Sequence, residues 1–323
     1  IGRDTVILPV VPMFHVNAWG TPYSAAMSGA KIVFPGAGMD GKNLHELIES
    51  EQATLLLGVP TVWLGLLNYL DSINAKMHSV NHVVVGGSAA PLAMVRAFDE
   101  KHDAFLIHAW GMTEMSPLGT VNSPTTELMA LPKEERYKRQ LKQGRPIYGV
   151  DLKIIDDDGN ELPRDGKAYG RLLVRGPWIT SGYYKSEDRS AFVDGWFDTG
   201  DVATLDALNT MQIVDRRKDV IKSGGEWISS IDLENIAVGH QAVKEACVIG
   251  VPHPKWDERP ILLIVLKDGA SATKEDLISY VSQHIAKFWI PDDVVFVPDL
   301  PHTATGKLHK VPLREQYANH LMV

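Results

Sequence analysis

The first third of the chain alternates between apolar, β-branched runs and helical patterns, and this alternation limits the folds open to it. The apolar runs cover residues 6–11, 31–34, 54–59, 83–85 and 105–109. The helical patterns lie between them at 44–51, 61–70 and 92–102. Near-continuous apolar strands that alternate with helices are typical of a parallel sheet covered on both faces. We therefore predict an α/β fold that contains part of a doubly wound sheet, with ligands beyond the carboxyl ends of its strands.

The pattern changes twice further along the chain. Residues 124–143 are polar and include a charged helical piece at 133–142. Short strands and turns follow, among them the hairpin-turn sequence Asp-Asp-Asp-Gly-Asn at 156–160. The last part offers strands at 246–251, 261–266 and 294–297 and helices at 274–286 and 311–320. We predict three parts: a partial α/β domain at 1–143, a β-rich subdomain at 144–215, and a mobile α+β domain at 216–323.

Composition narrows the class of protein. The 323 residues carry a net charge of −8 and no dominant basic block, so neither nucleic acid nor an anionic membrane is an expected partner. No apolar run approaches the roughly 20 residues that span a bilayer, and the first residues lack the pattern of a signal peptide. The single Cys247 sits in an apolar run, which favours a buried structural thiol in a reducing compartment. We expect a cytoplasmic protein.

Two segments that follow apolar runs could bind a ligand. The first has the small-residue sequence Gly86-Gly87-Ser88-Ala89-Ala90-Pro91, which lets a flat ligand approach the backbone, or simply permits tight helix–sheet packing. Because Ala90 stands where a G-x-S-x-G elbow needs glycine, a serine hydrolase is disfavoured. The second segment is Trp110-Gly111-Met112-Thr113-Glu114. Its hydroxyl and carboxylate could hold a phosphate oxygen and Mg²⁺, or merely cap a helix.

Three later segments carry charge beside glycine. In Thr199-Gly200-Asp201 the carboxylate could accept ribose hydroxyls, although aspartate is also an ordinary turn residue. In Thr303-Ala304-Thr305-Gly306-Lys307 the lysine could reach a phosphate or carboxylate oxygen, or only aid solubility. Residues 215–229 combine basic residues with paired glycines, which suits either an anion-binding loop or a solvated hairpin between domains.

In their order and spacing along the chain, the five segments resemble the adenylate-forming superfamily of acyl-CoA ligases, peptide-synthetase adenylation domains and luciferases. The likeness extends over essentially all 323 residues. Within the superfamily the chain is most similar to medium- and long-chain fatty acyl-CoA ligases, including those acting on methylthio-propionate. The hints are the sequences His-Val-Asn-Ala-Trp-Gly at 15–20, Gly-Glu-Trp-Ile-Ser-Ser at 225–230 and Phe-Trp-Ile-Pro-Asp-Asp at 288–293.

The resemblance implies a two-step reaction. ATP and a carboxylic acid give an acyl-adenylate and pyrophosphate, and the thiol of coenzyme A then displaces AMP to give the thioester. By similarity, Lys307 bridges the attacking carboxylate and the α-phosphate, Thr113 binds phosphate and Glu114 holds Mg²⁺. Lys218 falls where the small domain pivots between the two steps, in a hinge near 215–218. Close relatives of this kind are usually homodimers, so a homodimer is possible here.

The resemblance also assigns the binding sites. Its nucleotide-binding residues are Gly87, Ser88, Ala89, Trp110, Gly111, Asp201 and Arg216. Its acyl-pocket residues are His15, Trp19 and Met112. Its residues for coenzyme A are Gly224, Gly225, Glu226 and Trp227.

One family feature is absent from this sequence. The Ser/Thr/Gly-rich, lysine-containing phosphate loop lies upstream of the histidine segment in the family, and no stretch here matches it. We therefore expect a C-terminal fragment of the enzyme that binds nucleotide poorly alone. The alternatives are a non-catalytic relative that binds acyl or nucleotide ligands, and a peptide-synthetase adenylation domain. An NAD-dependent oxidoreductase would need G-x-G-x-x-G after a strand, which this sequence lacks.

Overall fold

The computed structural model describes residues 1–224 and 226–322, and the chain divides into two compact units. The first unit contains residues 1–199 and 203–213. The second contains residues 200–202 and the chain from 214 on. The division therefore falls close to the predicted hinge, whose role as a pivot remains a prediction. Each unit is described by itself below.

The first unit is organised around a seven-stranded sheet with the order β2-β1-β3-β4-β5-β6-β7. Its strands are β1 (Val6–Pro9), β2 (Lys31–Ile32), β3 (Leu55–Gly58), β4 (His82–Val85), β5 (Phe105–Gly111), β6 (Leu118–Val121) and β7 (Arg145–Pro146). The helices of this part are α1 (Val16–Trp19), α2 (Thr21–Ser28), α3 (Gly41–Glu51), α4 (Pro60–Ser72), α5 (Leu92–His102), the 3₁₀ turn η1 (Thr113–Met115), α6 (Thr126–Met129) and α7 (Lys133–Gln140). Strands β1 to β5 pair in parallel and β6 and β7 antiparallel. The predicted α/β class is thus confirmed.

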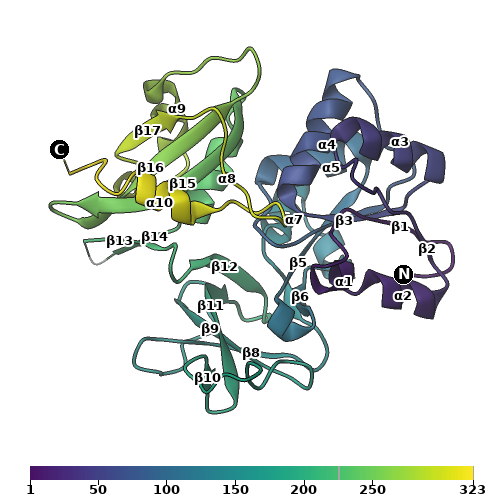
Figure 1. Ribbon diagram of the computed structural model, residues 1–323, viewed down its shortest axis with the longest axis horizontal. Coiled ribbons are helices and arrows are strands. Elements are labelled where there is room, and N and C mark those ends of the chain that lie inside the picture. The colour runs from purple at the N-terminus through teal and green to yellow at the C-terminus, as the bar shows by residue number, and fades with distance from the viewer. Residues whose placement is uncertain (225, 323) are drawn as a thin grey trace. The chain divides into compact units, whose positions relative to one another are not determined.

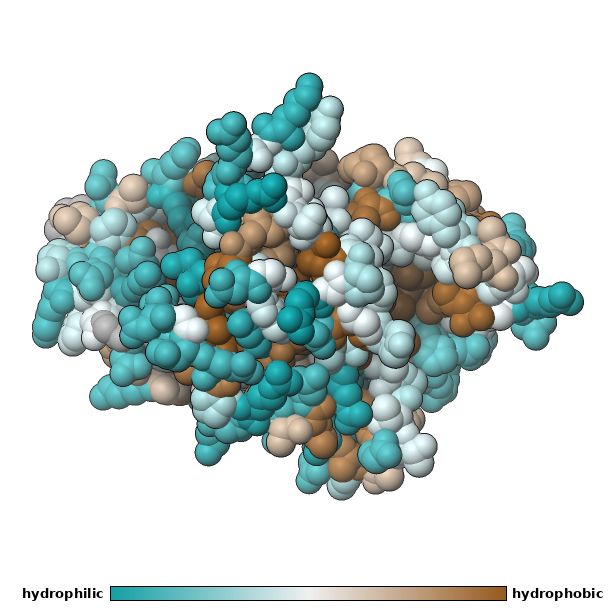
Figure 2. Space-filling view, turned by 90° about the horizontal axis from the view of Figure 1, so that it is seen from below, coloured by the Kyte–Doolittle hydropathy of each residue, from teal (hydrophilic) through white to brown (hydrophobic). Residues whose placement is uncertain are grey.

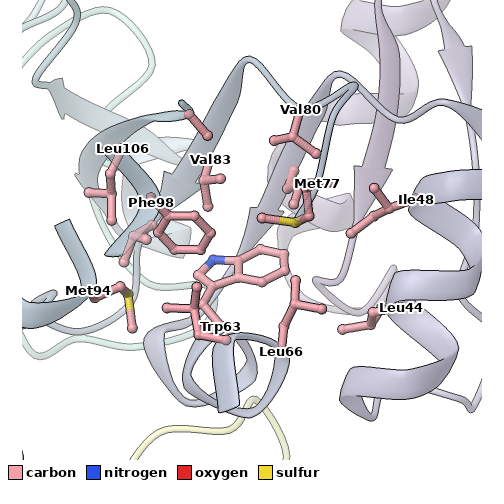
Figure 3. Packing of buried hydrophobic residues seen from close by; sticks show 14 of the residues in the cluster. Leu44, Ile48, Trp63, Leu66, Met77, Val80, Val83, Met94, Phe98 and Leu106 are labelled. Atoms are coloured by element: carbon pink, nitrogen blue, oxygen red, sulfur yellow. The ribbon is translucent and has the colours of Figure 1, made fainter. Parts of the chain in front are cut away.

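Helices cover both faces of this sheet (Figure 1). Trp63 of α4 is fully buried in a cluster that includes Leu44 of α3, Phe98 of α5 and Met77 of the connection between α4 and β4 (Figure 3). Its ring lies so close to Gly58 that a Cβ there would stand 2.6 Å from it. A smaller cluster fills the opposite face under α1 and α2. Both faces of the sheet are therefore buried under packed helices.

A five-stranded antiparallel sheet follows, with the order β10-β11-β9-β8 and β12 on β11. Its strands are β8 (Asp151–Ile155), β9 (Tyr169–Arg175), β10 (Phe192–Val193), β11 (Trp196–Leu205) and β12 (Met211–Arg216). The predicted turn at 156–160 is present, because the Asn160 carbonyl accepts from the Asp156 backbone N–H at 3.0 Å. The β-rich composition of this segment is therefore matched by the structure.

The second unit is an α+β domain on a sheet with the order β14-β13-β16-β15 and β17 on β16. Its elements are β13 (Ile221–Ser223), β14 (Glu226–Ile228), α8 (Ser230–Val238), β15 (Val243–His253), β16 (Asp257–Leu266), α9 (Lys274–Ser282), η2 (Lys287–Trp289), β17 (Asp293–Phe296) and α10 (Lys310–Gln316). Alternate residues of β15 face two separate clusters. Ala246 and Val248 pack under α8 and α9, whereas Cys247 and Ile249 pack under α10. Both faces of the sheet are therefore buried, as the fully apolar strands require.

Four of the described α-helices were absent from the expectations, namely the short α1 and α6 and the longer α2 and α8. Helix α2 has small residues and little apolar periodicity, and left-handed Gly20 and Gly29 mark its ends. Helix α8 is capped by the preceding residue Ser229, whose side chain accepts from the Asp232 backbone N–H. That Ser-x-x-Asp pattern is a readable helix-start signal. Helices α9 and α10 are also shorter than predicted, because cap residues end α9 at Ser282 and α10 at Gln316.

Large apolar side chains remain exposed at several places. The most exposed are Tyr148, Tyr184, Met27 and Phe14. Figure 2 shows hydrophobic surface interspersed with hydrophilic residues on one face. No helix in the described part of the chain is long and apolar enough to cross a bilayer.

Phe98→Ala should destabilise the first unit by about 3–5 kcal/mol, because it opens a cavity beside Trp63. Phe98 is fully buried, whereas Phe34 is 55% exposed, so Phe34→Ala serves as the matched control. Urea unfolding monitored by far-UV circular dichroism measures both. Equal midpoints for the two variants would contradict the packing described here.

Candidate active site

The turn that follows β4, at residues 86–91, packs closely against Trp19 and β5. Gly87 has a left-handed φ of +83°, which glycine adopts readily because it has no Cβ. A Cβ on Gly86 would stand 3.0 Å from the Trp19 ring and 3.3 Å from the Ala109 carbonyl oxygen. The structure therefore brings Trp19, a predicted acyl-pocket residue, beside the predicted nucleotide turn at 87–89. Gly87 and Ser88 are exposed and available to a ligand.

The segment between β1 and α2 is strained. Val16, Asn17, Ala18 and Trp19 all have φ between +47° and +57°. Left-handed backbone costs an L-residue roughly 1–2 kcal/mol, and most for a β-branched side chain such as Val16. Strain of this kind clusters at functional sites. It fixes the direction of Trp19 and follows directly on half-buried His15, the other predicted acyl-pocket residue in this segment.

His108 of β5 contacts the predicted nucleotide turn from the core side. Its Nε2 lies 3.3 Å from the Ser88 carbonyl oxygen, and its Nδ1 lies 3.1 Å from the Leu141 carbonyl oxygen. The ring is 1% exposed, and burial lowers its pKa to about 4. A neutral imidazole donates only one hydrogen bond, and because the Leu141 carbonyl also accepts from Gln143 Nε2 at 3.3 Å, the ring N–H can be directed to the Ser88 carbonyl. His108 thus orients the backbone of Ser88 as a neutral group.

The segment after β5 presents Thr113 and Glu114 at the edge of the sheet. A Cβ on Gly111 would lie 1.8 Å from the Pro117 carbonyl oxygen, so only glycine fits there. Tyr183 donates its hydroxyl to Glu114 Oε1 at 3.0 Å. Trp110 and Met112 pack partly against the core of the β-rich part. Thr113 is exposed, which leaves its hydroxyl available to a phosphate.

Mg²⁺ fits this arrangement only with help from a substrate. No group of three or more potential ligands occurs among the residues that the structure describes. Mg²⁺ is commonly held by one or two carboxylates together with substrate phosphates and water. Glu114, with a carboxylate held by Tyr183, is suited to that role.

A second group of polar residues lies within the second unit. Arg216 Nε lies 3.2 Å from Oδ1 of Asp201, a side chain that is almost fully buried. Partial burial lowers the pKa of Lys307, the charge of Arg216 lowers it further, and Asp201 opposes both. The unit therefore groups the three residues predicted to act on ribose and phosphate. The resemblance had assigned these residues to one reaction, but no local sequence pattern links Arg216 to Lys307, which is 91 positions away.

The Lys307 loop is a tight hairpin. The Thr303 N–H donates to the Lys307 carbonyl at 2.8 Å, and the Lys307 N–H donates to the Thr303 hydroxyl at 3.2 Å. An isolated antiparallel bridge joins His302 to Leu308 at its base. These bonds fix the backbone from which the Lys307 side chain extends.

The predicted coenzyme A residues lie on the hairpin formed by β13 and β14. Gly224 donates its N–H to the Trp256 carbonyl at 2.9 Å, and a Cβ on it would stand 2.7 Å from the Trp256 ring. Lys222 Nζ lies 6.0 Å from the centroid of the Trp227 ring. Glu226 is exposed on the same hairpin, and Gly225 lies outside the described residues. Trp256 was missed from sequence, since an isolated Trp carries no motif.

The structure thus gathers the predicted residues into three places. Around the sheet of the first unit lie the acyl and nucleotide segments with Thr113 and Glu114. Asp201, Arg216 and Lys307 belong together in the second unit, and the β13–β14 hairpin of the same unit carries the residues predicted for coenzyme A. Turns that let a ligand approach the backbone lie beside a carboxylate in the first unit, and a cationic loop lies beside an ion pair in the second; each is a feature found in nucleotide-binding proteins.

Comparison with known proteins agrees with this class. Residues 1–184 match the family described as AMP-binding enzyme, and residues 232–307 match the AMP-binding enzyme C-terminal domain. The chain belongs to the AMP-binding enzyme family. It is 52% identical to a 3-methylmercaptopropionyl-CoA ligase of Ruegeria lacuscaerulensis, over 98% of this chain and 59% of that protein. It is 50% identical to a medium-chain-fatty-acid–CoA ligase of Ectopseudomonas oleovorans, over 99% of this chain and 58% of that protein.

A solved structure gives the same result. The anthranilate CoA ligase AuaEII in complex with anthranoyl-AMP superposes with a TM-score of 0.87 at 26% identity, over all of this chain and 60% of that one. The chain therefore spans under two thirds of the length of these relatives. The resemblance to medium-chain fatty acyl-CoA ligases and to methylthio-propionate ligases is confirmed.

Acid should destabilise the first unit through His108. With a folded pKa of about 4 and an ordinary value near 6.5, the neutral ring stabilises the fold fully above pH 6.5. That stability is lost as pH falls from 6.5 to 4, by up to about 3 kcal/mol. His108→Gln should reduce this loss, whereas His78→Gln at an exposed position should not. Thermal unfolding between pH 4.5 and 7.5 measures it, and an unchanged pH slope in His108→Gln would contradict the assignment.

Proposed function

We propose that the full-length protein is an ATP-dependent acyl-CoA ligase that releases AMP and pyrophosphate. The observation that carries the proposal is the grouping of Lys307 with Asp201 and Arg216 in one unit. Membership of the AMP-binding enzyme family supports it, as do relatives of about 50% identity whose names are those of CoA ligases. ATP, coenzyme A and a carboxylic acid are the substrates.

The first step joins two anions. A carboxylate oxygen attacks the α-phosphorus of ATP, and the bond to the pyrophosphate oxygen breaks. Lys307 offsets the negative charge that gathers between the two groups. Asp201 accepts the ribose hydroxyls and Arg216 donates to the ribose, while Gly87, Ser88 and Ala89 let the adenine approach the backbone.

Three further groups act on the phosphates and the acyl chain. Thr113 donates its hydroxyl to a phosphate oxygen. Glu114 would hold Mg²⁺, which supplies charge neutralisation at the phosphate oxygens when bound. His15, Trp19 and Met112 border the acyl chain, with Trp110 and Gly111 between the acyl and nucleotide sites. The strained segment at 16–19 supports this role for Trp19.

The second step replaces AMP by a thiol. The sulfur of coenzyme A attacks the acyl carbon, the bond to the AMP oxygen breaks, and the thiol proton passes to solvent. Gly224, Gly225, Glu226 and Trp227 border the thiol's path. Lys218 is the pivot that exchanges Lys307 for the β13–β14 hairpin at the reacting centre, since a few loop residues can absorb such a rotation.

The chemical class of acid is aliphatic. The names of the relatives, which refer to medium-chain fatty acids and to methylmercaptopropionate, support this class. We also propose a cytoplasmic location, which the single buried Cys247 supports, and a homodimer as the assembly.

Lys307→Ala in the full-length protein should slow pyrophosphate release by on the order of 10²–10³-fold, because the step loses a cation aimed at its developing charge. Lys244→Ala, at an exposed position of the same unit, is the matched control. A coupled pyrophosphate assay in single turnover measures both. Unaltered release in Lys307→Ala would remove its catalytic role and favour a binding protein.

Lys218→Pro should spare adenylation and slow thioester formation at least tenfold, because proline fixes φ where the pivot must rotate. Lys218 is exposed, so its side chain is dispensable and Lys218→Ala is the control. Quenched-flow measurement of the two half-reactions separates them. Equal loss in both half-reactions would argue against a pivot at this position.

A further inference from the structure

The hairpin that carries Lys307 stands on the face of the second unit's sheet that α10 covers. Leu300, before the hairpin, and Leu308, after Lys307, pack into the cluster that contains Cys247 and Ile249 of β15. Apolar burial is non-directional, so these contacts hold the base of the hairpin without fixing the direction in which Lys307 extends.

One charged residue interrupts this apolar face of β15. Residues alternate between the two faces of a strand, so Glu245 lies on the same face as Cys247 and Ile249. Its Oε2 is shielded from solvent, and no hydrogen bond of good geometry reaches that atom from the described residues. A buried carboxylate oxygen in this position needs a positive charge beside it.

His302, at the base of the hairpin, supplies that charge when it is protonated. Its Nε2 lies 3.3 Å from Glu245 Oε2, and the two side chains are 27% and 26% exposed. His302 also forms the isolated bridge to Leu308, and the next residue, Thr303, donates its N–H to the Lys307 carbonyl. The ion pair therefore ties the first strand of the hairpin to β15.

The surroundings of His302 favour its charged form. Glu245 raises the pKa of the ring above its ordinary value of 6.5, partial burial opposes this effect, and Asp299 adds a smaller effect in the same direction as Glu245. The cations of α10, Lys310 and Arg314, pair with other carboxylates. The charged pair is therefore complete below pH 6.5 and is lost as pH rises through the higher pKa of the folded protein.

We propose that His302 is a positioning residue that, when protonated and paired with Glu245, holds the Lys307 hairpin against β15 for adenylation. The proposal rests on the function proposed for Lys307. His302 and Glu245 both lie beyond the predicted pivot at Lys218 in the chain, so rotation at that position leaves the ion pair intact. Adenylation, and not thioester formation, therefore slows when the ring loses its proton.

The test follows adenylation by the full-length protein from pH 6 to pH 9. His302→Gln keeps a hydrogen-bond donor and removes the charge, and His309→Gln is the matched control at an exposed position beside the hairpin. We expect His302→Gln to slow adenylation by about fivefold or more at pH 6, because a small misplacement of a catalytic group is costly. The ratio of the unaltered to the variant rate should fall towards one by pH 9. Lys307 is present in both proteins, so its own titration cancels in this ratio.

Two further measurements separate positioning from general stability. Thioester formation from supplied acyl-adenylate should stay within about twofold in His302→Gln, because Lys307 acts only in the first step. His302→Lys keeps its charge at pH 9 and should adenylate about threefold or more faster there than His302→Gln.

Other outcomes would overturn the proposal. A rate ratio that does not change with pH does so, and so does equal slowing of both half-reactions with a lowered thermal midpoint, which is the result of a structural role alone. Failure of His302→Lys to restore adenylation at pH 9 also counts against it. If His302→Gln fails to fold, Glu245→Gln takes its place, because it removes the other charge of the pair and should give the same pH-dependent ratio. Absence of that ratio contradicts the proposal.

Lys307→Ala measured alongside separates this proposal from the function. If Lys307→Ala keeps full adenylation, the catalytic role of Lys307 fails. If Lys307→Ala loses adenylation while His302→Gln keeps it at every pH, only the positioning role fails.

Discussion

The carboxylate of Asp215 is the constraint on which the second unit depends. A buried charge is costly unless it is hydrogen-bonded and paired, and Asp215 accepts from two backbone N–H groups close to the Lys310 cation. Burial still raises its pKa. Its hydrogen-bond donors come from β12 and α8 and the nearby cation comes from α10, so one carboxylate links three elements of the unit. Arg216 is the next residue, and its own backbone N–H donates to Asp215, so its backbone is fixed as well.

The first unit relies instead on glycines that let neighbouring side chains and backbone pack closely against the chain. Gly86 leaves room for Trp19, Gly111 for the Pro117 carbonyl, and Gly58 for Trp63. Side chains at these glycines would push apart the strand ends where the acyl and nucleotide segments meet. His108 completes the arrangement from the core side by hydrogen-bonding the Ser88 carbonyl as a neutral ring. Packing in this unit and buried charge in the other serve the same purpose, which is to hold backbone segments in fixed positions.

The fold was largely predictable from sequence, because strands β1, β3, β4 and β5 are continuous apolar runs separated by periodic helices. Helix α8 was missed although its Ser229 cap is readable, and α2 has too little apolar periodicity to be found. The order of the motifs also indicated the candidate site. The partners that hold it were not predictable: Tyr183 lies 69 positions from Glu114 and Lys310 lies 76 from Glu234, with no shared motif. Such pairings depend on tertiary packing, which a single sequence does not record.

The central claim is that an acyl-adenylate forms, and the fate of a carboxylate oxygen tests it most directly. The full-length protein is given ATP, coenzyme A and a fatty acid labelled with ¹⁸O in its carboxyl group. Mass spectrometry of the nucleotide product should show AMP carrying one ¹⁸O atom, because the attacking oxygen stays on phosphorus when the thiol displaces AMP. ADP as the product, or AMP without the label, would contradict the account.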